Sequence, residues 1–452
     1  MLLQFSVTNF LSFKDEVTLN MMPTKSRVMK DHEMRDDRGK SVRALPIATL
    51  YGANASGKSN LVNALEFTQK LVLQGTRAEA STGVTPHLLD VESEEAPSRF
   101  EFVFKHEGVV FTYGFCVSKK TVHEEWLFAR FTSQESRLFE RITQNGRTVV
   151  EAGQKLEKDA GGSQFIEYLA RGTRPNQLFL TEANEKNVEL IKPVVHWFRD
   201  HLQIIRPDSK YRPVVFRADT DQDLLDYISR FLRVADTGIE ELQYESEPFD
   251  ADKHLSNFPE NLREQLIKNL EREKTAHLLF ESRLGTVAFS KEEKNGQKVI
   301  MYRKLKSQHQ RSDGRAVLFE LGVESDGTRR MLDLAPALQD TWKRDCVFVI
   351  DELDRSLHTQ LSRFFIESVI EAVSGKEGRG QFIMTTHDTN LLDRNLLRRD
   401  EIWFLEKDAG GASHMTSLAE YKVSEGLNYQ NGYLNGRFGA IPFIGNHRKL
   451  LK

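Results

Sequence analysis

Cysteine is nearly absent from the sequence. Only Cys116 and Cys346 occur among 452 residues, which is too few for a disulfide framework. No apolar run approaches the roughly 18 residues that a membrane-spanning helix needs, and the first residues alternate like a strand rather than forming a signal peptide. We therefore expect a cytoplasmic protein that has no membrane partner.

An excess of positive charge is also missing. The chain has 63 Lys and Arg against 66 Asp and Glu, for a formal net charge of −3. This balance argues against a strongly basic nucleic-acid protein, although a local basic face could still bind nucleic acid. Internal repeats and low-complexity tracts are lacking as well.

The length leaves room for a large core and more than one lobe. We expect an N-terminal part, residues 1–215, that contains an inserted antiparallel β lobe of short alternating strands at about residues 98–152. A helical insert is predicted for residues 216–285, and residues 286–452 form the C-terminal part.

What is present is a glycine-rich turn between an apolar strand and an amphipathic helix. The turn, Gly52–Ser59, matches G-x-x-x-x-G-K-[ST], the P-loop pattern. Its free N–H groups and the following helix N-terminus attract anions. Lys58 is expected to reach the β- and γ-phosphates of ATP, and the Ser59 hydroxyl to bind Mg²⁺. The predicted ATP-binding residues of this stretch are Gly52, Asn54, Ala55, Ser56, Gly57, Lys58, Ser59 and Asn60.

A second motif joins a continuous apolar run to two carboxylates. Cys346–Ile350 suits a central parallel strand covered on both faces, and Asp351 and Glu352 follow its carboxyl end. We expect Asp351 to hold Mg²⁺, directly or through water, and Glu352 to orient and polarise the attacking water. The alternative, an acidic turn after a buried strand, is common in the absence of a P-loop.

Two further segments could contact the phosphates of the nucleotide. His387 follows the next predicted strand, where it could donate a hydrogen bond to the γ-phosphate or be merely structural. Ser325 and Gly327 open a helix, either as a second anion-binding N-terminus or as a simple cap. The order of P-loop, Ser/Gly-rich helix start, acidic pair and histidine is that of the ABC-type ATPases.

The chain resembles an ABC-class ATPase head of the kind shared with SMC proteins and the overcoming-lysogeny-defect nucleases. More narrowly, it is similar to the ABC-type ATPases of abortive-infection and restriction-linked phage defence, the RloA/AbiL-like family. The resemblance implies an α/β P-loop NTPase of ABC ATPase type, with a mixed central sheet, an antiparallel β lobe and a helical insert. The segments that carry it are Glu324–Thr328, Ile350–His358, Thr385–Leu392 and Gly436–Phe443.

The resemblance also implies that two ATP molecules are buried between two copies of the chain. Ser325 and Gly327 stand where the signature loop of one subunit closes over the γ-phosphate held by the other, while Asp326 departs from the small residue usual there. The residue that couples an inserted lobe to ATP is not evident. Glu182 or Asn184, after a predicted short strand at Leu178–Thr181, could take that place.

The implied function is ATP hydrolysis by a homodimer, or a higher oligomer, in anti-phage defence, with control of a separately encoded toprim-fold nuclease (RloB-like). The chain has neither the long heptad coiled coil of SMC arms nor room for a nuclease domain after its last predicted strand, so we expect a stand-alone ATPase. Two alternatives stay open: an SMC/RecF-like DNA-repair ATPase that clamps DNA, and a scaffold that holds ATP and barely hydrolyses it.

Overall fold

The computed structural model describes residues 1–26, 28–36, 42–144, 146–218, 220–256, 259–271, 277–282, 285–294, 296–374, 379–422 and 426–442. Phe443, which ends the last of the four motif segments, lies outside these ranges. The chain divides into two compact units. The first unit comprises Met1–Pro207, Thr341–Asp354 and Phe365–Lys452, and the second unit comprises Asp208–Asp340 and Arg355–Phe364.

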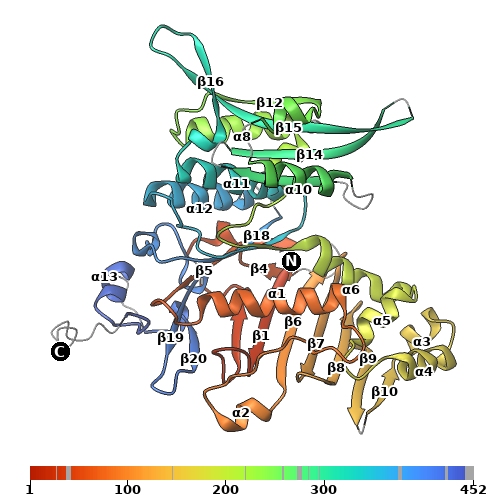
Figure 1. The fold of residues 1–452 in the computed structure, drawn as a ribbon. Coiled ribbons are helices and arrows are strands. Elements are labelled where there is room, and N and C mark those ends of the chain that lie inside the picture. Colours follow the sequence, from red (N-terminus) through yellow and green to blue (C-terminus); the bar gives the residue numbers. More distant parts are fainter. Residues whose placement is uncertain are drawn as a thin grey trace, which may run out of the picture. The chain divides into compact units, whose positions relative to one another are not determined.

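A mixed sheet forms the centre of the first unit (Figure 1). Its strand order is β11-β17-β18-β5-β19-β20, and neighbours run parallel except for the antiparallel pair β19–β20. Strands β5, β17 and β18 are buried at every position, as expected for parallel strands covered on both faces. The strands are β5 (Ile47–Tyr51), β11 (Leu202–Ile205), β17 (Val347–Ile350), β18 (Gln381–Thr385), β19 (Ile402–Lys407) and β20 (Ser413–Ser417).

An antiparallel sheet with the order β10-β9-β8-β7-β6-β1-β2 also belongs to the first unit. Strand β1 pairs with β6, so the predicted β lobe is continuous with the N-terminal hairpin. Alternate residues of β6, including Phe102 and Phe104, are buried against Trp197 and Phe198. The strands are β1 (Leu2–Thr8), β2 (Val17–Asn20), β6 (Ser98–His106), β7 (Val109–Val117), β8 (Val122–Arg130), β9 (Ser136–Gln144) and β10 (Arg147–Ala152).

These two sheets confirm the expected α/β fold class with a mixed central sheet and an antiparallel lobe. None of the described helices combines the length and apolar composition that a membrane crossing would require. The remaining elements of the first unit include β3 (Met34–Asp36), β4 (Val42–Ala44), α1 (Lys58–Gln74), α2 (Val91–Glu95), α3 (Gln154–Asp159), α4 (Ser163–Gly172), α5 (Phe179–Glu185), α6 (Lys192–His196) and α13 (Tyr429–Leu434).

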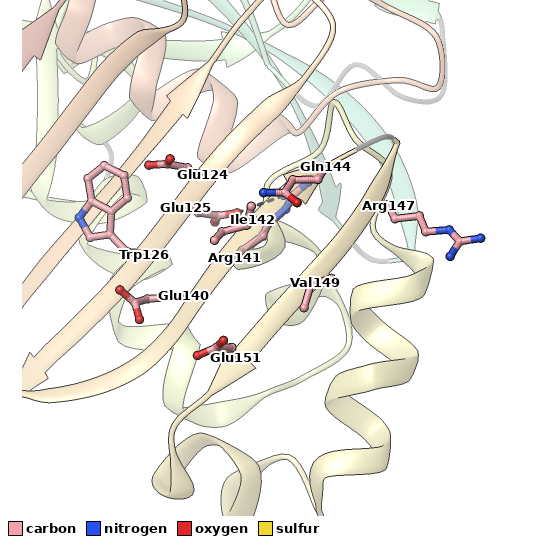
Figure 2. A pocket seen from close by; sticks show the side chains of 10 residues that line it. All are labelled: Glu124, Glu125, Trp126, Glu140, Arg141, Ile142, Gln144, Arg147, Val149 and Glu151. Atoms are coloured by element: carbon pink, nitrogen blue, oxygen red, sulfur yellow. Dashed lines mark hydrogen bonds and ion pairs between the residues drawn. The ribbon is translucent and has the colours of Figure 1, made fainter.

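Helix α5 corrects one prediction. The residues Leu178–Thr181 were expected to form a strand, but α5 begins at Phe179. The buried Glu125 carboxylate accepts hydrogen bonds from the backbone N–H groups of Phe179, at 2.6 Å, and Leu180, at 2.9 Å. Arg141 lies beside it at 3.2 Å, at the base of a hollow on β8, β9 and β10 (Figure 2). This cap from a distant strand satisfies the helix N-terminus that the local sequence leaves open.

The second unit is built around a sheet with the order β12-β15-β14-β13, and β16 pairs with β15. Residues 216–285 were expected to be helical, but they contain β12 and β13 as well as helices. The elements are α7 (Val214–Arg217), α8 (Gln222–Val234), β12 (Glu241–Pro248), α9 (Ala251–His254), α10 (Glu260–Glu271), β13 (His277–Ser282), β14 (Gly285–Lys294), β15 (Gln297–Gln310) and β16 (Ala316–Glu320). Two helices, α11 (Asp326–Lys343) and α12 (Thr359–Ser374), each contain residues assigned to both units.

Candidate nucleotide-binding site

The glycine-rich turn connects β5 to α1 and requires its two glycines. Gly52 and Gly57 have φ angles of 158° and 113°. A Cβ at Gly52 would lie 2.4 Å from the Leu405 carbonyl oxygen, and one at Gly57 would lie 2.5 Å from the Ser413 hydroxyl. Both the backbone conformation and the lack of space therefore exclude a side chain at these positions.

Hydroxyl groups from distant parts of the chain support the turn. Ser413 Oγ donates to the Ser56 carbonyl oxygen at 2.7 Å and lies 2.7 Å from Ser12 Oγ. Asn60 Nδ2 donates to Ser12 Oγ, also at 2.7 Å. Ser56 and Asn60 were predicted from the P-loop pattern, but Ser12 and Ser413 were not, because neither belongs to a recognisable motif.

The Lys58 ammonium lies folded against the turn. Its Nζ donates to the carbonyl oxygens of Gly52, at 2.8 Å, and Ala53, at 3.0 Å. Burial lowers the pKa of Lys58 to about 8, although nearby carboxylates, Asp351 foremost, act in the opposite direction. A phosphate oxygen would be a stronger acceptor than these neutral carbonyls, because charge-assisted hydrogen bonds are about twice as strong as neutral ones. The exposed tip of the turn carries Asn54 and Ala55.

Oxygen atoms gather between the turn and the carboxyl end of β17. Ser59 Oγ donates to Asp351 Oδ1 at 3.2 Å, and Thr385 Oγ1 donates to the same oxygen at 2.8 Å. A hydroxyl and a carboxylate at this spacing fit a hard cation such as Mg²⁺, which keeps several waters and binds through few protein ligands. The described residues contain no cluster of three or more His, Cys, Asp or Glu side chains that could hold a metal ion by themselves.

Glu352 and His387 both lie next to this group. Glu352 has a φ of 53°, which is unusual for a residue other than glycine, and its N–H donates to Thr385 Oγ1 at 2.7 Å. Such conformations persist where the surrounding structure enforces them, and they cluster at functional sites. The His387 N–H lies 3.3 Å from both carboxylate oxygens of Asp354. Partial burial, followed by the Lys58 charge, lowers the pKa of His387, and the carboxylates of Asp354, Glu352 and Asp351 oppose that shift.

Arg206 is a charged residue of this site that the sequence motifs did not predict. It follows β11, and its guanidinium lies 3.4 Å from Asp351 Oδ2, 2.6 Å from Asn63 Oδ1 and 2.5 Å from Glu66 Oε2. Asp351 similarly follows the neighbouring parallel strand β17. A charged residue directly after the apolar run of β11 was the available signal.

Glu182 and Asn184, the two residues expected to couple the inserted lobe to ATP, do not lie beside Asp351. Glu182 and Asn184 lie in α5, and within the described residues no hydrogen bond joins either side chain to the turn or to Asp351. The residue that contacts the Asp351 carboxylate from an adjacent strand end is Arg206 instead.

Ser325 and Gly327 belong to the second unit. Ser325 Oγ accepts a hydrogen bond from the Thr328 N–H at 3.1 Å, which caps the start of α11. A Cβ at Gly327 would lie 2.7 Å from the Ser356 carbonyl oxygen. The predicted signature loop therefore packs directly against the chain at Ser356, and Gly327 allows that close approach.

The fold and this site together define a P-loop ATPase. A family model described as "AAA domain, putative AbiEii toxin, Type IV TA system" matches residues 47–393, and the chain belongs to this family. No curated protein matches the chain.

Solved structures of SMC heads and of RecF are similar to the chain at low identity. The SMC head domain from Thermotoga maritima is 12% identical, with a TM-score of 0.38, and the match covers 93% of this chain and 99% of that one. An SMC head bound to the C-terminal winged-helix domain of ScpA is 13% identical, with a TM-score of 0.34 and coverage of 92% and 97%. The recombination mediator RecF is 13% identical, with a TM-score of 0.33 and coverage of 92% and 98%.

Proposed function

We propose that the chain hydrolyses ATP as a homodimer that closes around two Mg²⁺–ATP molecules. The observation that carries this proposal is the convergence of Lys58, Ser59 and Asp351 at one end of the central sheet, with Glu352 and His387 next to them. Family membership supports a nucleotide as the ligand of this group.

Each residue has a distinct role in the proposed reaction. The turn N–H groups and Lys58 bind the β- and γ-phosphates, and Ser59 and Asp351 would hold Mg²⁺, which neutralises charge on the phosphate oxygens. Glu352 orients the attacking water and accepts its proton. His387 donates a hydrogen bond to the γ-phosphate as charge develops there. Ser325 and Gly327 of the other chain in the dimer close the site.

We further propose that this dimer is the sensor of an anti-phage, abortive-infection system in the cytoplasm, of the RloA/AbiL-like kind. The family description, which names an Abi toxin and a toxin–antitoxin system, supports a role in such defence. The proposed effector is a separately encoded toprim-fold nuclease, which the ATP-bound dimer would license to cleave.

The central test uses Glu352→Gln, which removes the proposed base but keeps the shape of the side chain. We expect steady-state ATP hydrolysis to fall by about a hundredfold or more, and an ATP-dependent dimer to accumulate in light scattering. Lys58→Ala is the matched control, because it should lose ATP binding and remain a monomer with or without ATP. Unchanged turnover in Glu352→Gln would refute the assignment of the base.

The biological role needs a separate test. The gene next to this one should encode a toprim-type nuclease, and coexpression should yield a complex of the two proteins whose nuclease activity requires intact Glu352 in the ATPase. A neighbouring gene without such a nuclease, or nuclease activity that ignores the ATPase, would contradict the sensor role and leave ATP hydrolysis untouched.

A further inference from the structure

The segment that follows His387 borders a pocket of the first unit that the nucleotide site does not use. The pocket has a volume of about 600 Å³, within the range of small-molecule sites. A neighbouring pocket of about 440 Å³ shares Arg394, Asn395 and Tyr429 with it. Neither pocket contains a residue of the glycine-rich turn. The residues that line the larger pocket are Thr24, Ser26, Val28, Arg394, Asn395, Leu397, Arg398, Arg399, Asp400, Ala419 and Tyr429.

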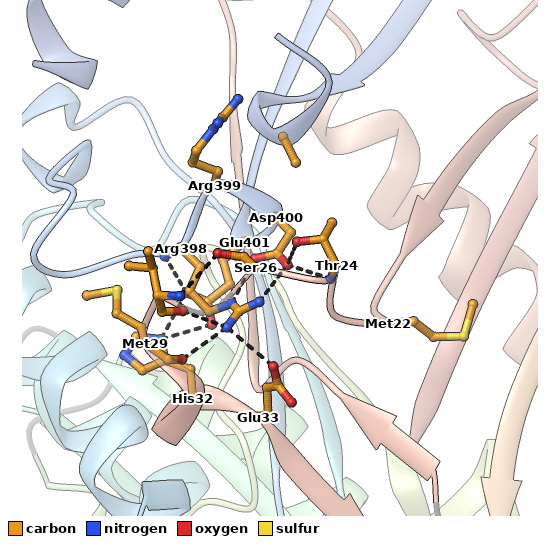
Figure 3. A network of polar contacts seen from close by, with 12 residues as sticks. Met22, Thr24, Ser26, Met29, His32, Glu33, Arg398, Arg399, Asp400 and Glu401 are labelled. Carbon is orange, nitrogen blue, oxygen red and sulfur yellow. Dashed lines mark hydrogen bonds and ion pairs between the residues drawn. The ribbon is translucent and has the colours of Figure 1, made fainter. Parts of the chain in front are cut away.

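One arginine of this pocket has its charge balanced within the protein. Arg398 is buried, and its guanidinium donates to both oxygens of Asp400, at 2.9 and 2.8 Å. It also donates to the carbonyl oxygens of Val28 and Met29. The N–H and the hydroxyl of Thr24 donate to Asp400 Oδ2. Figure 3 shows this closed network. Arg398 therefore fixes the segment around Thr24 to the pocket wall and has little capacity for a ligand.

Arg399 is arranged differently. In Figure 3 its guanidinium points away from the Arg398 network. It is held by the neutral carbonyl oxygens of Leu418, at 3.2 Å, and Tyr421, and its buried Nε has no hydrogen-bond partner. Within the described parts of the chain, no carboxylate forms an ion pair with Arg399. A fixed cation whose charge is not balanced suits an anionic ligand.

An aromatic ring and amide groups lie beside this cation. Burial raises the pKa of Tyr429, and the positive charges of Arg399 and Arg394 oppose that shift, so both arginines lie near the phenol. The side-chain amides of Asn390 and Gln430 are joined at 2.9 Å in the neighbouring pocket. Arginine for phosphate, tyrosine for a base ring and amides for base edges are the groups by which proteins bind unpaired nucleotides.

We propose that this pocket binds a nucleotide phosphate together with its base, as a second ligand site separate from the P-loop. Arg399 and Arg394 contact the phosphate, and Tyr429 stacks on the base. The ligand is either a free mononucleotide or one nucleotide of a single strand, because both offer the same phosphate and ring.

The test is made in the Lys58→Ala background, so that the P-loop does not contribute to binding. The probes are fluorescent AMP and a short fluorescent single-stranded oligonucleotide, followed by anisotropy. We expect at least one probe to bind, and Arg399→Gln to weaken that binding about tenfold or more, because a charge-assisted contact is lost. The matched control is Arg137→Gln, which removes an exposed arginine paired with Glu140 and Glu151 on β9 and β10.

A second variant keeps the proposal testable if Arg399→Gln does not fold. Asn395 is exposed in both pockets, and Asn395→Asp adds a negative charge without touching the anchor of Arg399. We expect it to weaken binding to a similar extent. Binding of the oligonucleotide alone identifies a strand as the ligand, and binding of AMP alone identifies a free nucleotide. If neither probe binds, or if the pocket variants bind like Arg137→Gln, the proposal is wrong.

Discussion

At the scale of single residues, His106 at the end of β6 is a histidine that the fold keeps neutral. Its side chain is 8% exposed, and its ring lies 4.5 Å from that of His201. Burial lowers the pKa of His106 to about 4, and the positive charges of His201, the N-terminus and His196 contribute to the shift, whereas Asp345 opposes it. The unfolded chain titrates near 6.5 at this residue.

This pKa shift predicts a stability that falls in mild acid. Between about pH 6.5 and 4 the unfolded state binds a proton that the folded state rejects, so the free energy of unfolding decreases as the pH falls, by at most about 3 kcal/mol. Urea unfolding at pH 7 and at about pH 5 measures the effect. His106→Asn should make the pH dependence shallower, whereas replacement of the exposed His414 should not. Equal slopes in both variants would contradict the prediction.

At the scale of elements, Ser413 of β20 supports the glycine-rich turn, and we predict that its loss weakens ATP binding. Ser413→Ala removes the hydroxyl that donates to the Ser56 carbonyl, so the turn should become less ordered. A lost hydrogen bond of about 0.5–1.5 kcal/mol corresponds to an increase of roughly two- to thirteenfold in the Kd for ATP, measured by calorimetry.

Ser6→Ala is the control for this prediction. Ser6 is also a buried serine, and its hydroxyl pairs with Thr18 at 2.8 Å in the antiparallel sheet, away from the turn. It should lower thermal stability without a change in the Kd for ATP. If both variants bind ATP like the parent protein, Ser413 does not position the turn.

Elements whose signals are local could be predicted from the sequence, whereas elements fixed by distant partners could not. The continuous apolar strands β5, β17 and β18 and the turn between β5 and α1 were predictable, because their signals are local. The start of α5 was not, since its cap is Glu125, more than fifty residues earlier. Strand β12 was missed for a similar reason: its partner is β15, with Glu241 opposite Gln308.

The residues of the candidate site also divide into those found through a local motif and those brought there by folding. Lys58, Ser59, Asp351 and His387 were found because each stands in a motif. Ser12 contacts Asn60, Ser413 contacts Ser56, and Arg206 contacts Asp351 only after the chain has folded, and none of the three stands in a motif. The position of Arg206 at a strand end was the one usable indication.

At the scale of the whole molecule, the proposed dimer divides each nucleotide site between two chains. Lys58 belongs to the first unit and Ser325 to the second unit of the fold. If Ser325 acts on the nucleotide of the partner subunit, a Lys58→Ala chain and a Ser325→Arg chain are each inactive alone. A mixed dimer then has one site in which both the turn and the Ser325 loop are intact.

Mixing these two variants should therefore restore part of the ATPase activity, because every mixed dimer has one intact site of two. Lys58→Ala mixed with Glu352→Gln is the matched control. Both of those changes act within the first unit of the same chain, so every site in the mixed dimer carries one of them and no activity should return. If activity also returns in the control, Lys58 and Glu352 from different chains act in the same site, and the subunits share more than the Ser325 loop. If both variants fold and mixed dimers form but no activity returns in the first mixture, each chain completes its own site.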